Sequence, residues 1–96
     1  MSVHLLQVTI ASPRTQFSAT TVNVSEVIIQ ADDGNSNPAF IGDVTVTTAN
    51  GIRLHNSATV PEEMTIGPQA AGSINLADLY VAGTNDEKVN VLYTKI

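Results

Sequence analysis

Residues 27–43 read Val-Ile-Ile-Gln-Ala-Asp-Asp-Gly-Asn-Ser-Asn-Pro-Ala-Phe-Ile-Gly-Asp, and this stretch decides the fold class. It starts with β-branched residues, continues through turn-forming residues at 32–38, and returns to apolar residues at 39–43. β-Branched and aromatic residues favour strands, whereas Asp, Asn, Ser, Gly and Pro favour turns. The stretch therefore predicts two strands joined by a polar loop.

Apolar residues alternate with period two along most of the chain, and helical periodicity is weak. Extended segments are predicted at residues 4–10, 15–19, 22–31, 39–48, 52–55, 63–66, 80–81 and 89–93, and at 74–79 a strand runs into one helical turn. About eight short strands separated by turns predict an all-β fold. We expect a small antiparallel β-sandwich, jelly-roll-like, or a barrel, as one domain over residues 1–96.

Three local features refine this prediction. The parity of the apolar positions changes at Ser25-Glu26, which predicts a bulge or a break in that strand. Asn50-Gly51 predicts a tight turn, because both residue types tolerate positive φ. Residues 44–48 are expected to continue the preceding strand in extended form.

Composition excludes several classes of protein. At 43% hydrophobic and 14% charged residues, the chain is expected to fold rather than to be disordered. The net charge is −5 and the four basic residues are scattered, so we expect no nucleic-acid partner. No apolar run is long enough to suggest a membrane span, and the start of the chain lacks the pattern of a signal peptide. Without cysteine, there are no disulfides or thiolate metal sites.

The acidic loop at 32–38 is the best candidate for a metal site. Asp33, Asn35 and Asn37 place oxygen ligands at alternating positions, which suits calcium. However, Pro38 stands where a calcium loop needs glycine, and Val44 stands where it needs a bidentate glutamate. We therefore interpret the segment as a turn and expect no metal and no cofactor.

No residue cluster is suited to catalysis. His4 and His55 lie in no metal or triad spacing, and no Gly-x-Ser-x-Gly motif is present. Glu62-Glu63 could pair with Asp86-Glu87 or Asp78, but these acids are expected in turns or at strand edges. We expect no catalytic residues and no enzyme activity, and a small hydrolase is the weakest of three hypotheses.

Five short motifs occur in an order that resembles small bacteriophage virion proteins. The resemblance extends from about Val22 to Tyr93 and is weakest near the start of the chain. One departure is Asp33-Gly34, where a proline is common in these proteins, and it changes only the turn. The motifs are Val27-Ile28-Ile29-Gln30-Ala31-Asp32, Phe40-Ile41-Gly42-Asp43, Asn50-Gly51-Ile52-Arg53-Leu54, Asp78-Leu79-Tyr80-Val81 and Val89-Asn90-Val91-Leu92-Tyr93.

The resemblance implies a capsid decoration (cement) protein or a head-fibre base. Such proteins are β-sandwiches, often trimers on the capsid surface, and the resemblance supplies no catalytic residues. We expect the protein on the outer capsid surface of a virion, as a homo-oligomer, a trimer, bound to the major capsid protein and bridging capsomers. A tail- or fibre-associated module that binds a host-surface glycan is the alternative. Exposed aromatics in a groove would favour that module, and a flat, apolar, trimeric face would favour the cement protein.

The segment from Leu5 to Ile10 is the candidate assembly device, since a hydrophobic N-terminal strand can exchange between subunits. Phe40 lies out of phase with Ile41, so it is expected to be exposed and is a second candidate contact. The predicted interface residues are Leu5, Leu6, Val8, Ile10 and Phe40.

Overall fold

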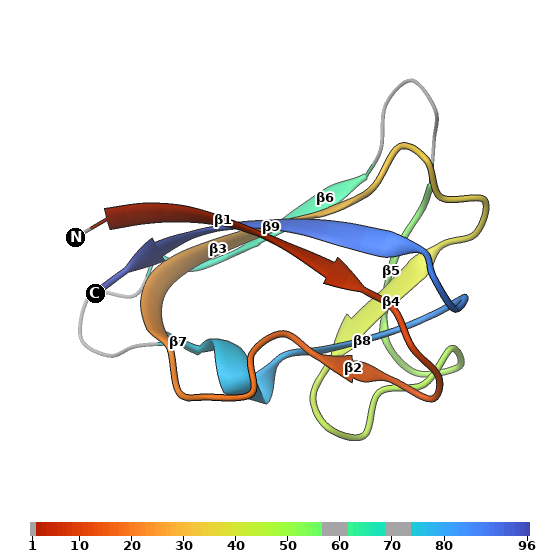
Figure 1. The fold of residues 1–96 in the computed structure, drawn as a ribbon, viewed down its shortest axis with the longest axis horizontal. Helices are drawn as coiled ribbons and strands as arrows, with labels where there is room; N and C mark the ends of the chain where they lie inside the picture. The colour runs from red at the N-terminus through yellow and green to blue at the C-terminus, as the bar shows by residue number, and fades with distance from the viewer. Residues whose placement is uncertain (1, 57–61, 69–73) are drawn as a thin grey trace.

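The computed structural model describes residues 2–56, 62–68 and 74–96, which form two antiparallel sheets packed face to face (Figure 1). The larger sheet has the order β1 (Ser2–Thr9), β9 (Lys88–Lys95), β3 (Asn23–Ala31) and β6 (Glu63–Ile66), with β7 (Ile74–Asn75) also beside β3. The smaller sheet has the order β2 (Thr15–Gln16), β8 (Tyr80–Ala82), β4 (Ala39–Gly42) and β5 (Ile52–Leu54). The predicted all-β sandwich is confirmed.

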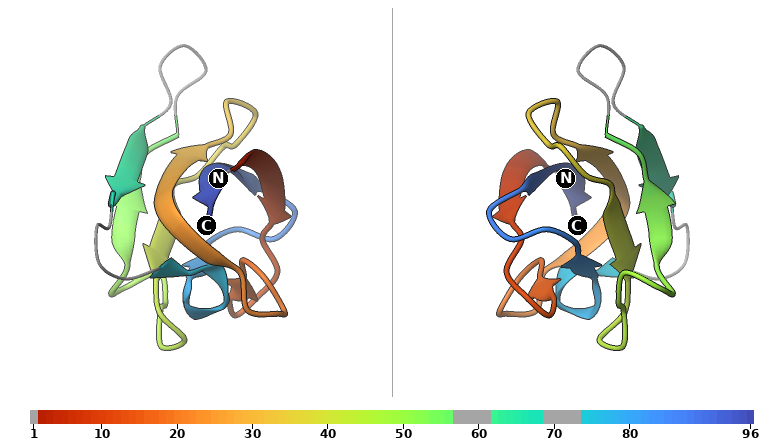
Figure 2. Two further views of the ribbon diagram at one scale, coloured as in Figure 1. Left: turned by 90° about the vertical axis from the view of Figure 1, so that its left-hand side faces the viewer. Right: turned by 90° about the vertical axis from the view of Figure 1, so that its right-hand side faces the viewer.

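The larger sheet curves over the smaller one, and both chain ends lie at one end of the sandwich (Figures 1 and 2). β1 and β2 form one side of the molecule, and β5 and β6 form the other (Figure 2). The described part of the chain contains no helix that is long and apolar enough to cross a membrane.

The core lies between the sheets, where alternate residues of each strand point inward. In β3 these are Val27, Ile29 and Ala31, all of them fully buried. In β9 they are Val89 and Val91, also fully buried. Because strand side chains alternate between faces, the residues between them point away from the core. The smaller sheet contributes Ala39, Ile41, Leu54 and Val81 to the same cluster, and Phe17 packs into it as well.

The bulge predicted in β3 is confirmed. The pairing of β3 with β9 shifts register between Val24 and Glu26. Val24 and Val27 are both fully buried although they are three residues apart. An extra residue in the bulge restores the inward direction on both sides of it.

The helical turn predicted near residue 76 is confirmed as a single turn of 3-10 helix, Leu76–Asp78. It forms because the Asn75 side-chain oxygen accepts hydrogen bonds from the backbone N–H groups of Ala77, at 3.0 Å, and Val22, at 3.2 Å. Asn75 thus caps the turn and ties it to the start of β3. Leu76 points into the core.

The prediction that residues 44–48 are extended is wrong. The Asp43 carboxylate accepts hydrogen bonds from the Thr45 backbone N–H at 2.9 Å and from its hydroxyl at 2.6 Å. The Val46 N–H then donates to the Asp43 carbonyl at 3.0 Å, which turns the chain. Side-chain bonds of this kind compete with a strand ladder, so β4 ends at Gly42.

The turn predicted at Asn50-Gly51 is present, but the reason given for it is wrong. Among the described residues, only Asp86 and Gly67 have positive φ. Gly51 is needed for space instead, because a Cβ there would lie 2.7 Å from the Phe40 Cβ and from the Val46 Cγ2. The turn approaches β4 too closely for any side chain at this position.

We predict that Gly51→Ala lowers the free energy of unfolding by about 1–3 kcal/mol, because the new methyl group overpacks a well-filled site. Urea unfolding of the purified variant measures the loss. Gly34→Ala is the control, since its new Cβ would meet only the end of the Asp32 side chain, at 3.0 Å. Equal losses in the two variants would contradict this explanation of Gly51.

Candidate functional site

Three apolar residues form a row across the outer face of the larger sheet. Leu5 of β1 lies opposite Leu92 of β9, and Leu92 lies opposite Ile28 of β3. Leu5 is 76% exposed and Leu92 is 41% exposed, while Ile28 is partly buried. Residues opposite one another in neighbouring strands share a face and contact each other. We call Leu5, Leu92 and Ile28 the apolar row.

The apolar row is bordered by side chains that are mostly polar. On one side, Gln7, Asn90 and Gln30 lie opposite one another across the same three strands, and the Gln7 amide donates to Asn90 Oδ1 at 3.0 Å. The other side is formed by Val3, Thr94 and Glu26. Val3 is itself exposed and extends the apolar surface along β1. An apolar centre within a polar border is the usual composition of a protein interface.

The structure separates the predicted interface residues of the first strand. Leu5 lies on the outer face and is exposed, whereas Val8 and Ile10 are 5% and 2% exposed and pack in the core. Leu6 is partly buried against the same core. Alternation explains the division, because Leu6, Val8 and Ile10 share one parity and Leu5 has the other. Of these four residues, Leu5 is therefore the one that is exposed on the folded chain, and Leu6 is partly exposed.

Phe40, the other predicted contact, is partly buried and not exposed. Its Cβ packs beside Gly51, at the position where a further side chain would collide with it. Sequence analysis missed Ile28 and Leu92. The alternation of side chains could have identified them, because Leu92 and Ile28 are each next to a residue that is buried, Val91 and Ile29, and so point to the opposite face.

The acidic loop at 32–38 is held by hydrogen bonds within the protein. The buried Asn35 amide donates to the Lys88 carbonyl at 2.7 Å and accepts from the Lys88 N–H at 2.9 Å, as a neighbouring strand would. The Glu87 carboxylate accepts from the N–H groups of Ser36, at 2.6 Å, and Asn37, at 3.1 Å. The oxygen of Asn35 that would face a cation is thus used by the backbone. The described residues contain no cluster of three acidic, histidine or cysteine side chains placed to hold a metal.

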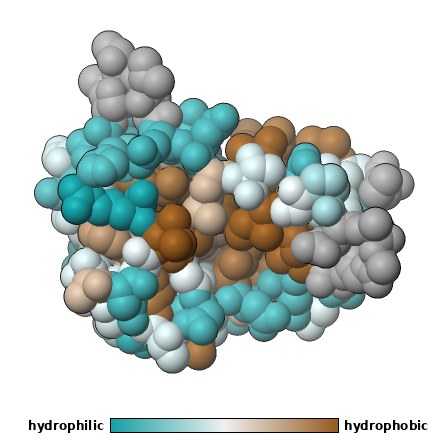
Figure 3. Space-filling view, turned by 180° about the vertical axis from the view of Figure 1, so that it is seen from behind, coloured by the Kyte–Doolittle hydropathy of each residue, from teal (hydrophilic) through white to brown (hydrophobic). Residues whose placement is uncertain are grey.

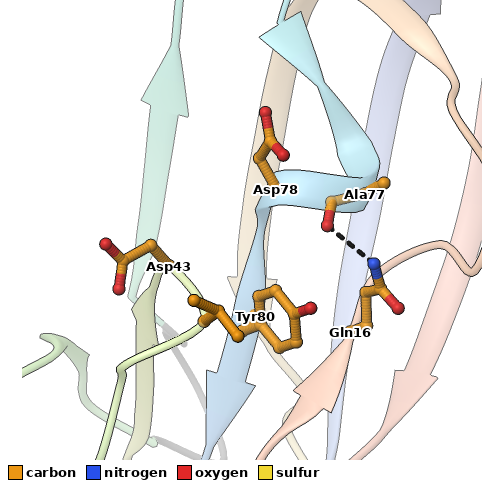
Figure 4. Close-up of a pocket in the computed structure, with 6 residues that line it drawn as sticks. Gln16, Asp43, Ala77, Asp78 and Tyr80 are labelled. Carbon is orange, nitrogen blue, oxygen red and sulfur yellow. Dashed lines mark hydrogen bonds between the residues drawn. The ribbon is translucent and has the colours of Figure 1, made fainter.

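An open hollow of about 490 Å³ lies at one end of the smaller sheet (Figure 4). It is lined by Gln16, Asp43, Val44, Ala77, Asp78 and Tyr80. The Gln16 amide donates to the Ala77 carbonyl at 2.8 Å, and the carboxyl groups of Asp43 and Asp78 point away from the Tyr80 ring (Figure 4).

The Asp43 carboxyl of this hollow is not suited to act as a general acid. The hydrogen bonds from the Thr45 hydroxyl and backbone N–H lower the pKa of Asp43 below its ordinary value. A carboxyl that acts as a general acid near neutral pH needs a raised pKa. The Asp43 carboxylate instead stabilises the turn that follows β4, through its hydrogen bonds with Thr45.

A second hydrophobic area lies on the side of the sandwich formed by β5 and β6, which faces away from the viewer in Figure 1. Seen from behind, hydrophobic residues gather at the centre of the face, above a hydrophilic lower border (Figure 3). β5 and β6 lie on this side (Figure 2). Ile52 of β5 is 60% exposed, whereas Met64 and Ile66 of β6 are partly buried against the core. Met64 and Ile66 therefore belong in part to the core, and Ile52 is the exposed residue of these three.

Comparison with known proteins gives one structural likeness. No model of a protein family matches the chain, and no curated protein matches it. The fold is similar to that of a chain in the cryo-EM structure of the virus-like particle of the extra small virus of the giant freshwater prawn Macrobrachium rosenbergii. The TM-score is 0.55 at 10% sequence identity, over 98% of this chain and 75% of that chain. At this identity the likeness concerns the fold.

We predict that Asn35→Ala destabilises the protein, because it leaves the N–H and the carbonyl of Lys88 without their partner. A buried polar group left unsatisfied costs about 1–3 kcal/mol. Thermal and urea unfolding measure the effect. Asn37→Ala is the matched control, because Asn37 is exposed and takes part in the loop through its backbone N–H. Equal stability of the two variants would show that the Asn35 amide does not hold the loop.

Proposed function

We propose that the protein is a structural component of a virion, and that it decorates the outer surface of a bacteriophage capsid. There it binds the major capsid protein and stabilises the shell by bridging neighbouring capsomers. The observation that carries the proposal is the apolar row on the outer face of the larger sheet, where Leu5 and Leu92 are exposed. The fold, which is similar to that of a chain in a virus-like particle, supports the broader part of the proposal, a structural role in a virion.

The apolar row provides a physical basis for binding. Fully burying a leucine side chain stabilises a complex by about 1.5–3 kcal/mol, and Leu5 and Leu92 are both exposed in the isolated chain. One such contact is weak, but an oligomer that bridges capsomers makes several at once, and linked contacts raise the overall affinity. The net charge of −5 keeps a dense array of copies soluble.

The alternative, a tail- or fibre-associated module that binds a host-surface glycan, has less support. Sugar-binding β domains present exposed aromatic side chains, whereas all four aromatic residues here are described and are buried or partly buried. Tyr80 lines the hollow of Figure 4. The hollow is where that alternative would place its ligand.

We predict that the purified protein co-sediments with phage capsids that lack it and raises the temperature at which they disrupt. Leu92→Gln should weaken capsid binding by about 10-fold or more, since the loss of roughly 1.4 kcal/mol changes the dissociation constant tenfold. Titration of capsids with labelled protein, followed by sedimentation, measures the change.

Ile52→Gln is the matched control, because Ile52 is also exposed but lies on the smaller sheet. It should bind capsids as the unmodified protein does. The proposal fails if the unmodified protein ignores capsids, and binding to host cells or their polysaccharide would then favour the glycan module. Equal loss in both variants would place the contact elsewhere than on the apolar row.

A further inference from the structure

The larger sheet ends in a long strand with one open side. β1 has eight residues, and among the described strands it pairs with β9 alone. It contains no proline, and His4 is its only ionisable side chain. Natural proteins protect an edge of this kind with charges, prolines, bulges or a covering segment, because its unpaired backbone groups recruit other strands. β1 has none of the first three features.

The other described edge strands differ from β1. β2 and β7 have two residues each, β5 has three and includes Arg53, and β6 has four and begins at Glu63. These strands are short, and two of them are charged, so they offer little backbone for pairing. A strand from another molecule would therefore pair more favourably with β1 than with any of these edge strands.

The hydrogen-bond pattern identifies the backbone groups that face the open side. Beyond the last pair of β1 and β9, the Ile10 N–H donates to the Glu87 carbonyl at 2.7 Å. On the far side of β9, the Asp32 N–H donates to the Lys88 carbonyl at 3.1 Å. Ile10 thus bonds toward β9. In an antiparallel pair every second residue bonds to the neighbouring strand, so the even-numbered residues of β1 bond to β9. The odd-numbered residues Val3, Leu5, Gln7 and Thr9 therefore direct their N–H and carbonyl groups outward.

We propose that β1 is a self-assembly edge, at which two copies of this chain pair antiparallel across a two-fold axis through Leu5. In this register Leu5 lies opposite Leu5 of the second copy, and Val3 lies opposite Gln7. All of these residues present outward backbone groups, so the pair forms about six hydrogen bonds. The two larger sheets become one continuous sheet.

Two features of the surface fit a second copy as the occupant. The register joins the two apolar rows end to end, so that Leu5 of each copy covers the other and one longer apolar surface results. Charge does not oppose the pairing, although each copy has a net charge of −5. The acidic residues on this part of the face, Glu26 of β3 and Asp32 directly after it, belong to the strand two away from β1, or roughly 10 Å. At that distance exposed charges are largely screened at physiological ionic strength.

The pairing is tested on the purified protein alone, so its outcome is separate from that of capsid binding. Light scattering at high micromolar concentration should give a dimer, and not the trimer that the resemblance to virion proteins implies. Because the chain has no cysteine, Leu5→Cys introduces a single thiol beside the proposed axis. A short bis-maleimide should link it into a covalent dimer, whereas Ile52→Cys, exposed on the other sheet, should remain uncrosslinked under the same conditions.

Two further variants distinguish the edge from the face of the sheet. Leu5→Pro removes an outward N–H but no bond to β9, and proline is tolerated at such positions of edge strands. It should give a folded monomer by circular dichroism and light scattering. Leu92→Lys changes the apolar row within the sheet, on a strand that is two strands from β1 of the second copy, and should remain a dimer.

Several results would overturn the proposal. They are a monomer or a trimer for the unmodified protein, equal crosslinking of the two cysteine variants, and a dimer that survives Leu5→Pro. Loss of the dimer in Leu92→Lys would show that copies stack through their faces. If Leu5→Pro does not fold, crosslinking of Leu5→Cys decides the question.

Discussion

The structure depends on the pairing of β9 with β1 on one side and with β3 on the other. β9, near the end of the sequence, lies between β1, near its start, and β3. Because side chains alternate, this register places Val89 and Val91 in the core and Leu92 outside. A slip of one residue would bury Leu92 and expose both valines. The same register therefore determines the core and the apolar row.

A small domain gains stability from surfaces that it buries against neighbours. A chain of 96 residues buries a limited fraction of its surface on folding. Here the inner face of the larger sheet is used by the core, while the outer face and the β1 edge remain for other molecules. The two proposals use different chemistry, since side chains of the apolar row would contact a capsid and backbone groups of β1 would contact a second copy.

Local patterns in the sequence predicted much of the fold. The period-two alternation predicted β1, β3 and β9, and the change of parity predicted the bulge near Glu26. Residues 44–48 were mispredicted because the Asp43 side chain replaces a strand bond, and propensity alone does not show which bond wins. The apolar row was missed because Leu5 and Leu92 meet only through pairing of distant segments. Alternation shows which residues share a face of one strand, but it does not show which strands are neighbours.

The central claim is that the outer face of the larger sheet binds a viral shell. Cryo-electron microscopy of phage capsids reconstituted with the protein tests it most directly. The account predicts ordered density outside the shell, with Leu5 and Leu92 turned toward the major capsid protein. Capsids without added density, or density in which this face points into solvent, would contradict the account.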